Sequence, residues 1–354
     1  MKYLPNSEEK VYCGIDFHKN TSTLCALSLR GLEIEPLTTI QTNRLVQYLS
    51  NRKSWKIGIE ATGGVNEMAA RLKECGHEVV IVNSNKFRGI GIGGKKTDER
   101  DARALAECLR LNFIPEVYQR SRYARELKTL IVSREMVVRS RVNLMNHIRG
   151  TLREYGVTIP VGAENFYNQA DENIKSLSQP LIVQSLLVML EMISSMRVQE
   201  MSLEGSIKLV VGEDVRFERL QTAPGVGVMT AAMMIAVVDD ISRFKSAKEF
   251  ASYLGLTPSV SASADKRMMG SITRSGSEIL RRYLIHGARA WMRYSPNGDH
   301  NRQWAEKLRD RRGMNKAVVA LAHRMARICF AMLRDEVGYK RSSTTTTISE
   351  AEVA

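Results

Sequence analysis

Hydrophobic positions along the first third of the chain form short β-prone runs separated by amphipathic stretches. Three of these runs precede the first helical pattern, which indicates an antiparallel meander joined to parallel strands. The sequence therefore predicts an α/β domain over residues 1–118. The expected strands lie near 11–16, 22–29, 32–39, 55–60 and 78–82, and the expected helices near 43–50, 65–75 and 98–111.

The middle of the chain has a purely helical pattern. Apolar residues recur at helical spacing over about 120–155 and again over about 180–211, with a loop containing Pro160 between them. Two long amphipathic helices in this order predict an antiparallel hairpin or coiled-coil arm over residues 119–215.

A third pattern, mostly helical, begins near Phe217. It opens with Pro224-Gly225-Val226-Gly227 before a helix of small residues, which is typical of a helix-hairpin-helix element. A hydroxyl-rich and cation-rich loop then leads into another helix, and a basic helical stretch runs from about 300 to 335. We expect a mostly helical domain over residues 216–340 and a disordered, low-complexity tail over residues 341–354.

The composition favours a polyanionic partner. The 354 residues include 52 Lys and Arg against 38 Asp and Glu, a formal net charge of +14, and nucleic acid is the economical explanation. The five cysteines are odd in number and lack CxxC spacing, which predicts reduced thiols and a cytoplasmic, nucleoid-associated protein. The apolar stretch Val228–Val238, taken as the longest, is too short to cross a bilayer, so we expect no membrane partner.

Four carboxylates at element boundaries form the candidate metal site. Asp16 and Glu60 end predicted strands, at the edge where open α/β sheets bind ligands. Asp98 and Asp101 open a predicted helix after the candidate N-cap Thr97 and lie on one face of it. Such hard oxygen ligands bind Mg²⁺ beside a phosphodiester in RNase H-like or RuvC-like nuclease cores, and Mn²⁺ is an alternative ion.

Each acid also has an ordinary structural explanation. Asp98 and Asp101 could complement the helix dipole, Asp16 could be a turn residue and Glu60 a solvated strand end. The combination favours the metal site. Four acids brought together without a cation would suffer strong like-charge repulsion.

Cations and glycines supply the candidate contacts to nucleic acid. The helix over about 120–155 is rich in arginine, and Lys95 and Lys96 follow a glycine-rich segment that we interpret as a loop near phosphate. Backbone amides near Gly225 and Gly227 could bind phosphate without reading sequence. Solvated surface charge and an ordinary tight turn are the competing explanations. The candidate contacts are Lys95, Lys96, Arg134, Arg141, Arg149, Gly225, Gly227, Lys266, Arg267, Arg274, Arg281 and Arg282.

The order of these motifs resembles a known family. The segments IDFHK, IEATGG and KTDERDA, then an Arg-rich helix, PGVG, GLTPSVSAS and GSITRSGSEILRR, are similar to the DEDD transposases of the insertion-sequence 110 family, 1111 subgroup, over about residues 11–335. The resemblance implies a RuvC-like domain in which Asp16, Glu60, Asp98 and Asp101 hold magnesium. It also implies a C-terminal transposase domain with a serine nucleophile, and an element-encoded noncoding guide RNA that pairs with donor and target DNA.

The residues alone do not select the serine, because any hydroxyl in the C-terminal stretch could instead cap a helix or contact phosphate. The open set is Ser259, Ser261, Ser263, Ser271, Thr273, Ser275 and Ser277. The resemblance places the nucleophile five residues beyond the proline of the GLTP motif, which is Ser263, with Ser261 in reserve.

The resemblance implies a transesterification in which Ser263 attacks the scissile phosphodiester of double-stranded DNA. Because the acids and the serine lie in different domains, we expect the working site to form between subunits of a homodimer or homotetramer. Two rival hypotheses are a RuvC-like endonuclease that uses activated water and a noncatalytic nucleic-acid scaffold. An actin-like ATPase also begins with a strand that ends in Asp, but the chain offers no convincing phosphate loop for it.

Overall fold

The computed structural model describes residues 10–83, 87, 97–263 and 266–340. The chain divides into two compact units, Met1–Gln119 and Arg120–Ala354. The arm and the C-terminal domain, which the sequence suggested as separate domains, fall in one unit.

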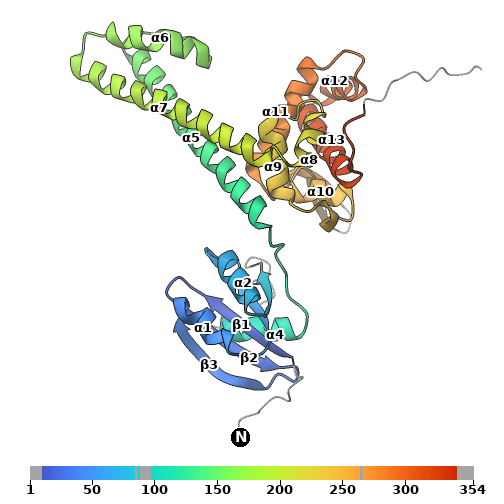
Figure 1. The fold of residues 1–354 in the computed structure, drawn as a ribbon. Coiled ribbons are helices and arrows are strands. Elements are labelled where there is room, and N and C mark those ends of the chain that lie inside the picture. The colour runs from blue at the N-terminus through green and yellow to red at the C-terminus, as the bar shows by residue number, and fades with distance from the viewer. Residues whose placement is uncertain (1–9, 84–86, 88–96, 264–265, 341–354) are drawn as a thin grey trace, which may run out of the picture. The chain divides into compact units, whose positions relative to one another are not determined.

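The N-terminal unit is an α/β domain built on one mixed sheet (Figure 1). The strand order is β3-β2-β1-β4-β5, with antiparallel pairs from β1 to β3 and parallel pairs from β1 through β4 to β5. This order confirms the predicted meander joined to parallel strands. The elements are β1 (Val11–Phe17), β2 (Thr21–Ser28), β3 (Glu33–Gln41), η1 (Thr42–Arg44), α1 (Leu45–Ser50), β4 (Lys56–Glu60), α2 (Val65–Glu74), β5 (Glu78–Val82) and α4 (Asp98–Arg110).

Helices cover both faces of this sheet. On one face, alternate residues of β1 such as Cys13 and Ile15 join a core with Leu49 of α1 and Leu72 of α2. On the other face α4 packs against β1 and β2. Burial of each large apolar side chain in this way stabilises the folded state by about 1.5–3 kcal/mol relative to leaving it in water.

Gly14 sets how closely α4 approaches the sheet. A Cβ at this position would lie 2.0 Å from the carbonyl oxygen of Ala102 and 2.5 Å from the backbone nitrogen of Ala106. No side chain fits there, because the helix backbone occupies the space. Glycine therefore allows the first turns of α4 to lie directly on β1, two residues before Asp16.

The C-terminal unit is mostly helical, as the sequence predicts, with one two-stranded sheet. Its elements are α5 (Arg122–Glu154), α6 (Ala163–Lys175), α7 (Pro180–Val211), α8 (Val215–Gln221), α9 (Val228–Val238), η2 (Ile241–Arg243), α10 (Ala247–Tyr253), β6 (Pro258–Ser263), β7 (Lys266–Ile272), α11 (Glu278–Tyr294), α12 (His300–Arg312) and α13 (Met314–Arg334).

The arm is a helical hairpin in which α7 runs back beside α5 (Figure 1). The segment between them was expected to be a loop, but it contains α6. Phe166, Ala170 and Ile174 recur every four residues on α6 and pack into a small core with Leu186 and Ile193 of α7. This short apolar stripe is the signal that the sequence analysis missed.

A second difference concerns the hydroxyl-rich stretch before α11. It was expected to be a loop, but it forms an antiparallel hairpin in which Pro258 pairs with Ile272 and Ser263 with Lys266. In β6, Val260 and Ala262 alternate with serines, a short strand pattern that the expectation of a loop overlooked, whereas β7 has no such alternation.

An ion-pair network joins the arm to the C-terminal core. Glu135 of α5 accepts hydrogen bonds from Arg282 and from the hydroxyl of Tyr283, both on α11, the latter at 2.5 Å. Arg134 contacts the same carboxylate at 2.9 Å. The Glu135 side chain is 11% exposed, so its partners are needed to compensate its burial.

Helix α7, with 32 residues, is long and apolar enough to cross a membrane by length and composition alone. The prediction that Val228–Val238 was the longest apolar stretch is therefore wrong. One such helix is weak evidence for a membrane span, since helices of packed bundles pass the same test. Its buried residues contribute to two protein cores, Leu186 and Ile193 to that of the arm and Ile207 and Val211 to that of the C-terminal domain.

Candidate active site

Two neighbouring parallel strands carry acids at their carboxyl ends, Asp16 as the penultimate residue of β1 and Glu60 as the last residue of β4. Ile15 of β1 pairs with Ile59 of β4, and the next residue in each strand is Asp16 or Glu60. Both acids therefore lie at the same edge of the sheet, where ligands bind in open α/β folds. Asp16 is 4% exposed and Glu60 is half-buried.

Helix α4 brings a third acid to this edge. The hydroxyl of Thr97 accepts a hydrogen bond from the backbone of Arg100 at 3.3 Å, which confirms the predicted N-cap and starts the helix at Asp98. Asp98 and Asp101 both lie in the first turn. Because α4 is seated on β1 through Gly14, its first turn is held beside the end of that strand.

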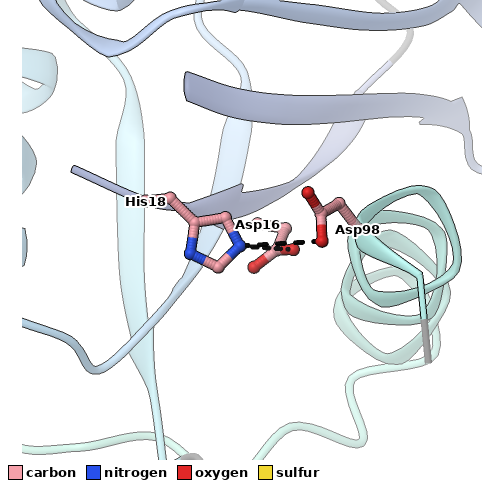
Figure 2. Close-up of side chains that lie close together, drawn as sticks. All are labelled: Asp16, His18 and Asp98. Atoms are coloured by element: carbon pink, nitrogen blue, oxygen red, sulfur yellow. Dashed lines mark hydrogen bonds and ion pairs between the residues drawn. The ribbon is translucent and has the colours of Figure 1, made fainter. Parts of the chain in front are cut away.

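His18 completes a compact group that the sequence analysis did not include. Its Nε2 lies 3.2 Å from Oδ2 of Asp16 and 3.7 Å from Oδ1 of Asp98 (Figure 2). Ligand atoms from these three side chains lie within 4.8 Å of one another. The signal was present in the segment IDFHK, where the histidine follows the first acid by two residues.

The electrostatics of Asp16 indicate a site suited to a cation. Burial raises the pKa of its carboxyl, the His18 ring opposes this shift, and the charges of Asp98 and Asp101 raise the pKa further. Asp101 is therefore close enough to act on Asp16, although it lies outside the compact group. A divalent cation would relieve the repulsion among these carboxylates.

The donor set fits a hard divalent ion. Carboxylate oxygens suit Mg²⁺ and Mn²⁺, and the added imidazole is tolerated more readily by transition metals. Asp16 and Asp98 would hold the ion, with His18 beside them. Glu60 ends the adjacent strand but is not part of the compact group.

Four of the seven candidate hydroxyls already have structural partners. Ser277 caps α11 by accepting from the backbone of Leu280 at 3.3 Å. The Ser259 hydroxyl donates to the carbonyl of Ser271 at 3.1 Å. Thr273 and Ser275 hydrogen-bond to each other at 3.1 Å. Ser263 is the last residue of β6 and pairs with Lys266 of β7.

The arm arginines that were predicted to contact nucleic acid have partners within the chain. Arg134 lies 2.8 Å from Glu200 and 2.7 Å from Glu204, and Arg141 lies 2.8 Å from Glu200. Arg149 donates to carbonyl oxygens in the segment that leads to α6. These contacts give all three cations a structural role in the arm, and their binding to nucleic acid stays a prediction.

Two C-terminal arginines also have structural contacts. Arg281 is 8% exposed and donates to the carbonyl oxygens of Leu254 at 3.3 Å and Ser275 at 2.7 Å, so it holds the end of the hairpin. Arg282 pairs with Glu135 as described above. Arg274, in contrast, is exposed.

The PGVG segment is held by close packing. Gly225 has φ +76°, and a Cβ there would lie 2.2 Å from the carbonyl oxygen of Gly287 on α11. Gly227 is the N-cap of α9 and has open space around it. Lys266 and Arg267 lie in β7, whereas Lys95 and Lys96 lie outside the described residues.

Two models of transposase families match this chain, one over the acidic site and one over the C-terminal helical domain. A family model of DEDD transposases matches residues 13–157, which include all four acids. A second model, described as the transposase IS116/IS110/IS902 family, matches residues 217–303, which include the β6–β7 hairpin. The transposase for insertion sequence element IS1111A of Coxiella burnetii is 31% identical over 92% of this chain and 90% of its own length. The chain belongs to the IS110 family of transposases.

Other relatives of this IS110-family transposase span nearly the whole chain. The transposase for insertion sequence element IS1328 of Yersinia enterocolitica is 25% identical over 90% of the chain and 95% of its own length. The pilin gene-inverting protein of Moraxella lacunata is 26% identical over 92% and 96%. These matches confirm the family that the motifs indicated and the expected activity, DNA strand transfer.

Proposed function

We propose that this IS110-family transposase cuts and rejoins DNA through a phosphoserine intermediate. Ser263 is the nucleophile, and Asp16, Glu60, Asp98 and Asp101 hold the metal. The observation that carries the proposal is the convergence of acids from β1 and α4 at one sheet edge, in a chain whose second unit matches the transposase family.

In this mechanism the hydroxyl of Ser263 attacks the scissile phosphorus, and the bond from phosphorus to the leaving strand oxygen breaks. The serine hydroxyl gives up its proton as the new bond forms, and the leaving oxygen takes up a proton and becomes a free hydroxyl, so protons balance. The hydroxyl of the exchanged strand then loses its proton and attacks the phosphoserine, the bond from phosphorus to the serine oxygen breaks, and a phosphodiester and the protonated serine hydroxyl are restored. A bound Mg²⁺ or Mn²⁺ ion supplies Lewis-acid stabilisation of the developing negative charge.

His18 positions the metal-binding carboxylates. Its ring contacts both Asp16 and Asp98, and its orientation therefore depends on the two groups that would hold the ion. Asp16 is buried within the fold and has little freedom to move. This arrangement preorganises the ligands before DNA binds.

A relative favours rejoining over hydrolysis. The Moraxella relative is named for inverting a gene, and an inversion requires that every broken strand end be joined again. Attack by water would release the energy of the phosphodiester bond, whereas a phosphoserine conserves it. We therefore favour a covalent serine intermediate over a water-using endonuclease.

Hydrogen bonds of four of the candidate hydroxyls weigh against those four as the nucleophile, and the choice of Ser263 rests on the family resemblance. Ser259, Thr273, Ser275 and Ser277 each take part in a hydrogen bond that stabilises the local fold. A nucleophile that also serves as a cap or a hairpin bond would have to break that contact to react. Ser263, at the end of β6, remains our assignment, with Ser261 as the reserve.

The partners follow from the same proposal. The net charge of +14 suits simultaneous binding of donor and target DNA and of a structured guide RNA. Since the metal ligands and Ser263 lie in different units, we propose that subunits of a homodimer or homotetramer complete each other's sites.

The decisive experiment traps the covalent adduct. Purified protein and its bound RNA are incubated with Mg²⁺ and a labelled DNA substrate, and adducts are separated under denaturing conditions. We expect the wild type to form an adduct and Ser263→Ala to form none, with Ser261→Ala as the matched control. Full recombination by Ser263→Ala would refute the assignment, and cleavage without any adduct would support the water mechanism.

Two further variants test the metal site and the shared subunits. Asp98→Asn with Asp101→Asn should retain DNA binding and lose cleavage; retained cleavage would exclude these acids. Mixing that double variant with Ser263→Ala should restore part of the activity, because some composite sites then contain an intact set of acids and an intact serine. No restoration in mixed oligomers would contradict a site shared between subunits.

A further inference from the structure

A large cavity lies in the C-terminal unit beside the β6–β7 hairpin. Its volume is about 1100 Å³, and it lies among the hairpin, α12 and α13. Val319, Ala320 and Ile328 of α13 supply apolar lining, and Gly270 and Ile272 of β7 line the side formed by the hairpin. A space of this size can enclose a small organic group.

The charged side chains that line the cavity are cationic, and Ser271, Asn315 and His323 supply its other polar groups. Lys316, Arg324 and Arg327 of α13 line it, and no Asp or Glu is among the described lining residues. Within the described part of the chain, none of the three has an ion-pair partner. Other arginines of these helices do have carboxylate partners, as Arg302 and Arg334 show. The cavity therefore presents uncompensated positive charge next to apolar surface.

An aromatic ring forms part of the same lining. The Arg324 guanidinium lies 4.9 Å from the ring centre of Trp304 on α12. Trp304 is partly exposed, whereas Trp55 and Trp291 are 6% and 1% exposed. A planar ring beside planar guanidinium groups offers a stacking surface for a base, with cations available for its phosphate.

We propose that this cavity binds an unpaired nucleotide. The base lies against the pair formed by Trp304 and the Arg324 guanidinium and against the apolar residues of α13, and Arg327 and Lys316 contact the adjoining phosphates. The inference rests on the proposed function, because the hairpin that forms one side of the cavity also carries Ser263. The nucleotide can come from the exchanged DNA strand or from the guide RNA, and both have the same chemistry.

Charge distinguishes this occupant from an apolar protein segment. Three cations covered by an apolar helix would lose water without gaining a counter-charge, which is costly. A nucleotide brings a phosphate anion and an aromatic base together, so it compensates both parts of the lining. A segment of a second copy is the alternative occupant, and the experiment below separates the two.

The test measures binding without catalysis. Full-length Ser263→Ala protein is mixed in EDTA with single-stranded DNA carrying one 5-iodouracil, and with RNA of the same sequence, then irradiated. We expect photo-crosslinks to peptides of α12 and α13. Of the two probes, DNA and RNA, the one that crosslinks more strongly to these helices represents the preferred ligand. Crosslinks confined to other segments with both probes would overturn the inference.

Variants add a quantitative readout. In fluorescence anisotropy, a base at one position of the oligonucleotide should strengthen binding about tenfold over an abasic residue there. Trp304→Leu should abolish this difference and Arg327→Gln should weaken binding of both probes, while the control Arg311→Gln on α12 should preserve the base-dependent difference. Thermal unfolding checks that each variant folds.

The outcomes separate this inference from the proposed function. If both variants folded, Trp304→Leu kept the base-dependent difference and Arg327→Gln bound both probes as the wild type does, the cavity would not be the nucleotide site. Formation of the Ser263 adduct by the wild type would in that case still support the proposed function. Crosslinking of the cavity to a second protein copy, with no nucleotide crosslink, would identify the alternative occupant and overturn the inference as well.

Discussion

Replacement of Gly14 by alanine tests whether the seating of α4 on β1 controls the metal site. The added Cβ would lie 2.0 Å from the carbonyl oxygen of Ala102, whereas ordinary van der Waals contact begins at 3.4 Å. The helix would have to retreat by the difference, about 1.4 Å. Two of the three atoms that clash, on Ala102 and Ala106, belong to the helix backbone, and the third is the Cβ of Leu105 at 2.8 Å, so rotation of a side chain cannot relieve the contact.

The consequences are large for stability and for activity. Overpacking of this kind costs about 3 kcal/mol, at the upper end of the usual range, because backbone must move. For a unit of this size that is a loss on the order of 10 °C in unfolding temperature. A displacement of about 1 Å at Asp98 and Asp101 should lower the cleavage rate about 100-fold.

Gly58→Ala is the matched control. Gly58 pairs with Gly14 across β1 and β4, but a Cβ at Gly58 would meet Leu109 at 3.5 Å, which is ordinary contact. We expect this variant to change stability by less than about 1 kcal/mol. Thermal unfolding and cleavage assays of both variants, with and without Mg²⁺, make the comparison. Equal stability and cleavage in Gly14→Ala and wild type would refute the proposed seating.

Three further predictions concern charged groups. The pKa of Asp16 is raised, so its ionised form costs stability at neutral pH. In the absence of metal, Asp16→Asn should therefore unfold at a higher temperature than the wild type. Addition of Mg²⁺ should raise the unfolding temperature of the wild type and leave that of the variant unchanged. A lower unfolding temperature for the metal-free variant than for the metal-free wild type, measured by thermal shift, would contradict this prediction. Glu135→Gln should lower the free energy of unfolding by about 2 kcal/mol in a denaturant titration, because the charge of Glu135, itself 11% exposed, compensates the partly buried Arg134 and Arg282. Glu126→Gln, at an exposed pair, should change this free energy by less than about 0.5 kcal/mol. Burial raises the pKa of Asp214, but hydrogen bonds and charge from Arg216 outweigh it and hold that pKa below its usual range. Its stabilisation is thus present above the unfolded pKa of about 3.9 and lost as pH falls through the folded pKa. The stability deficit of Asp214→Asn should shrink in acid, and a deficit independent of pH would reject this ion pair.

The N-terminal fold could be predicted because its information is local. Each strand of the sheet has its own apolar run, and each acid stands where such a run or a helix begins or ends. Asp16 and Glu60 were therefore assigned to one edge before their pairing was known. His18 was missed because only carboxylates were considered as ligands at this edge, although the histidine follows Asp16 by two residues and its ring lies 3.2 Å from that acid.

The cations could not be sorted from sequence, because their partners are distant along the chain. Arg134 was predicted to contact nucleic acid, yet its carboxylate partners on α7 lie 66 and 70 residues away. Arg282 meets a carboxylate 147 residues away. Nothing in the spacing of α5 or α11 identifies such pairs, since a helix rich in arginine has the same pattern whether its charges are paired or free.

This distinction changes which basic residues should be sought as nucleic-acid contacts. A cation already paired with a carboxylate must give up that pair to bind phosphate, so it gains little from the exchange. Arg324 and Arg327 have no such pair to break within the described chain, and they lie beside apolar surface and an aromatic ring. The arginines that the sequence made most conspicuous thus have partners within the arm, and we expect the less conspicuous Arg327 of α13 to be the more sensitive position in binding assays.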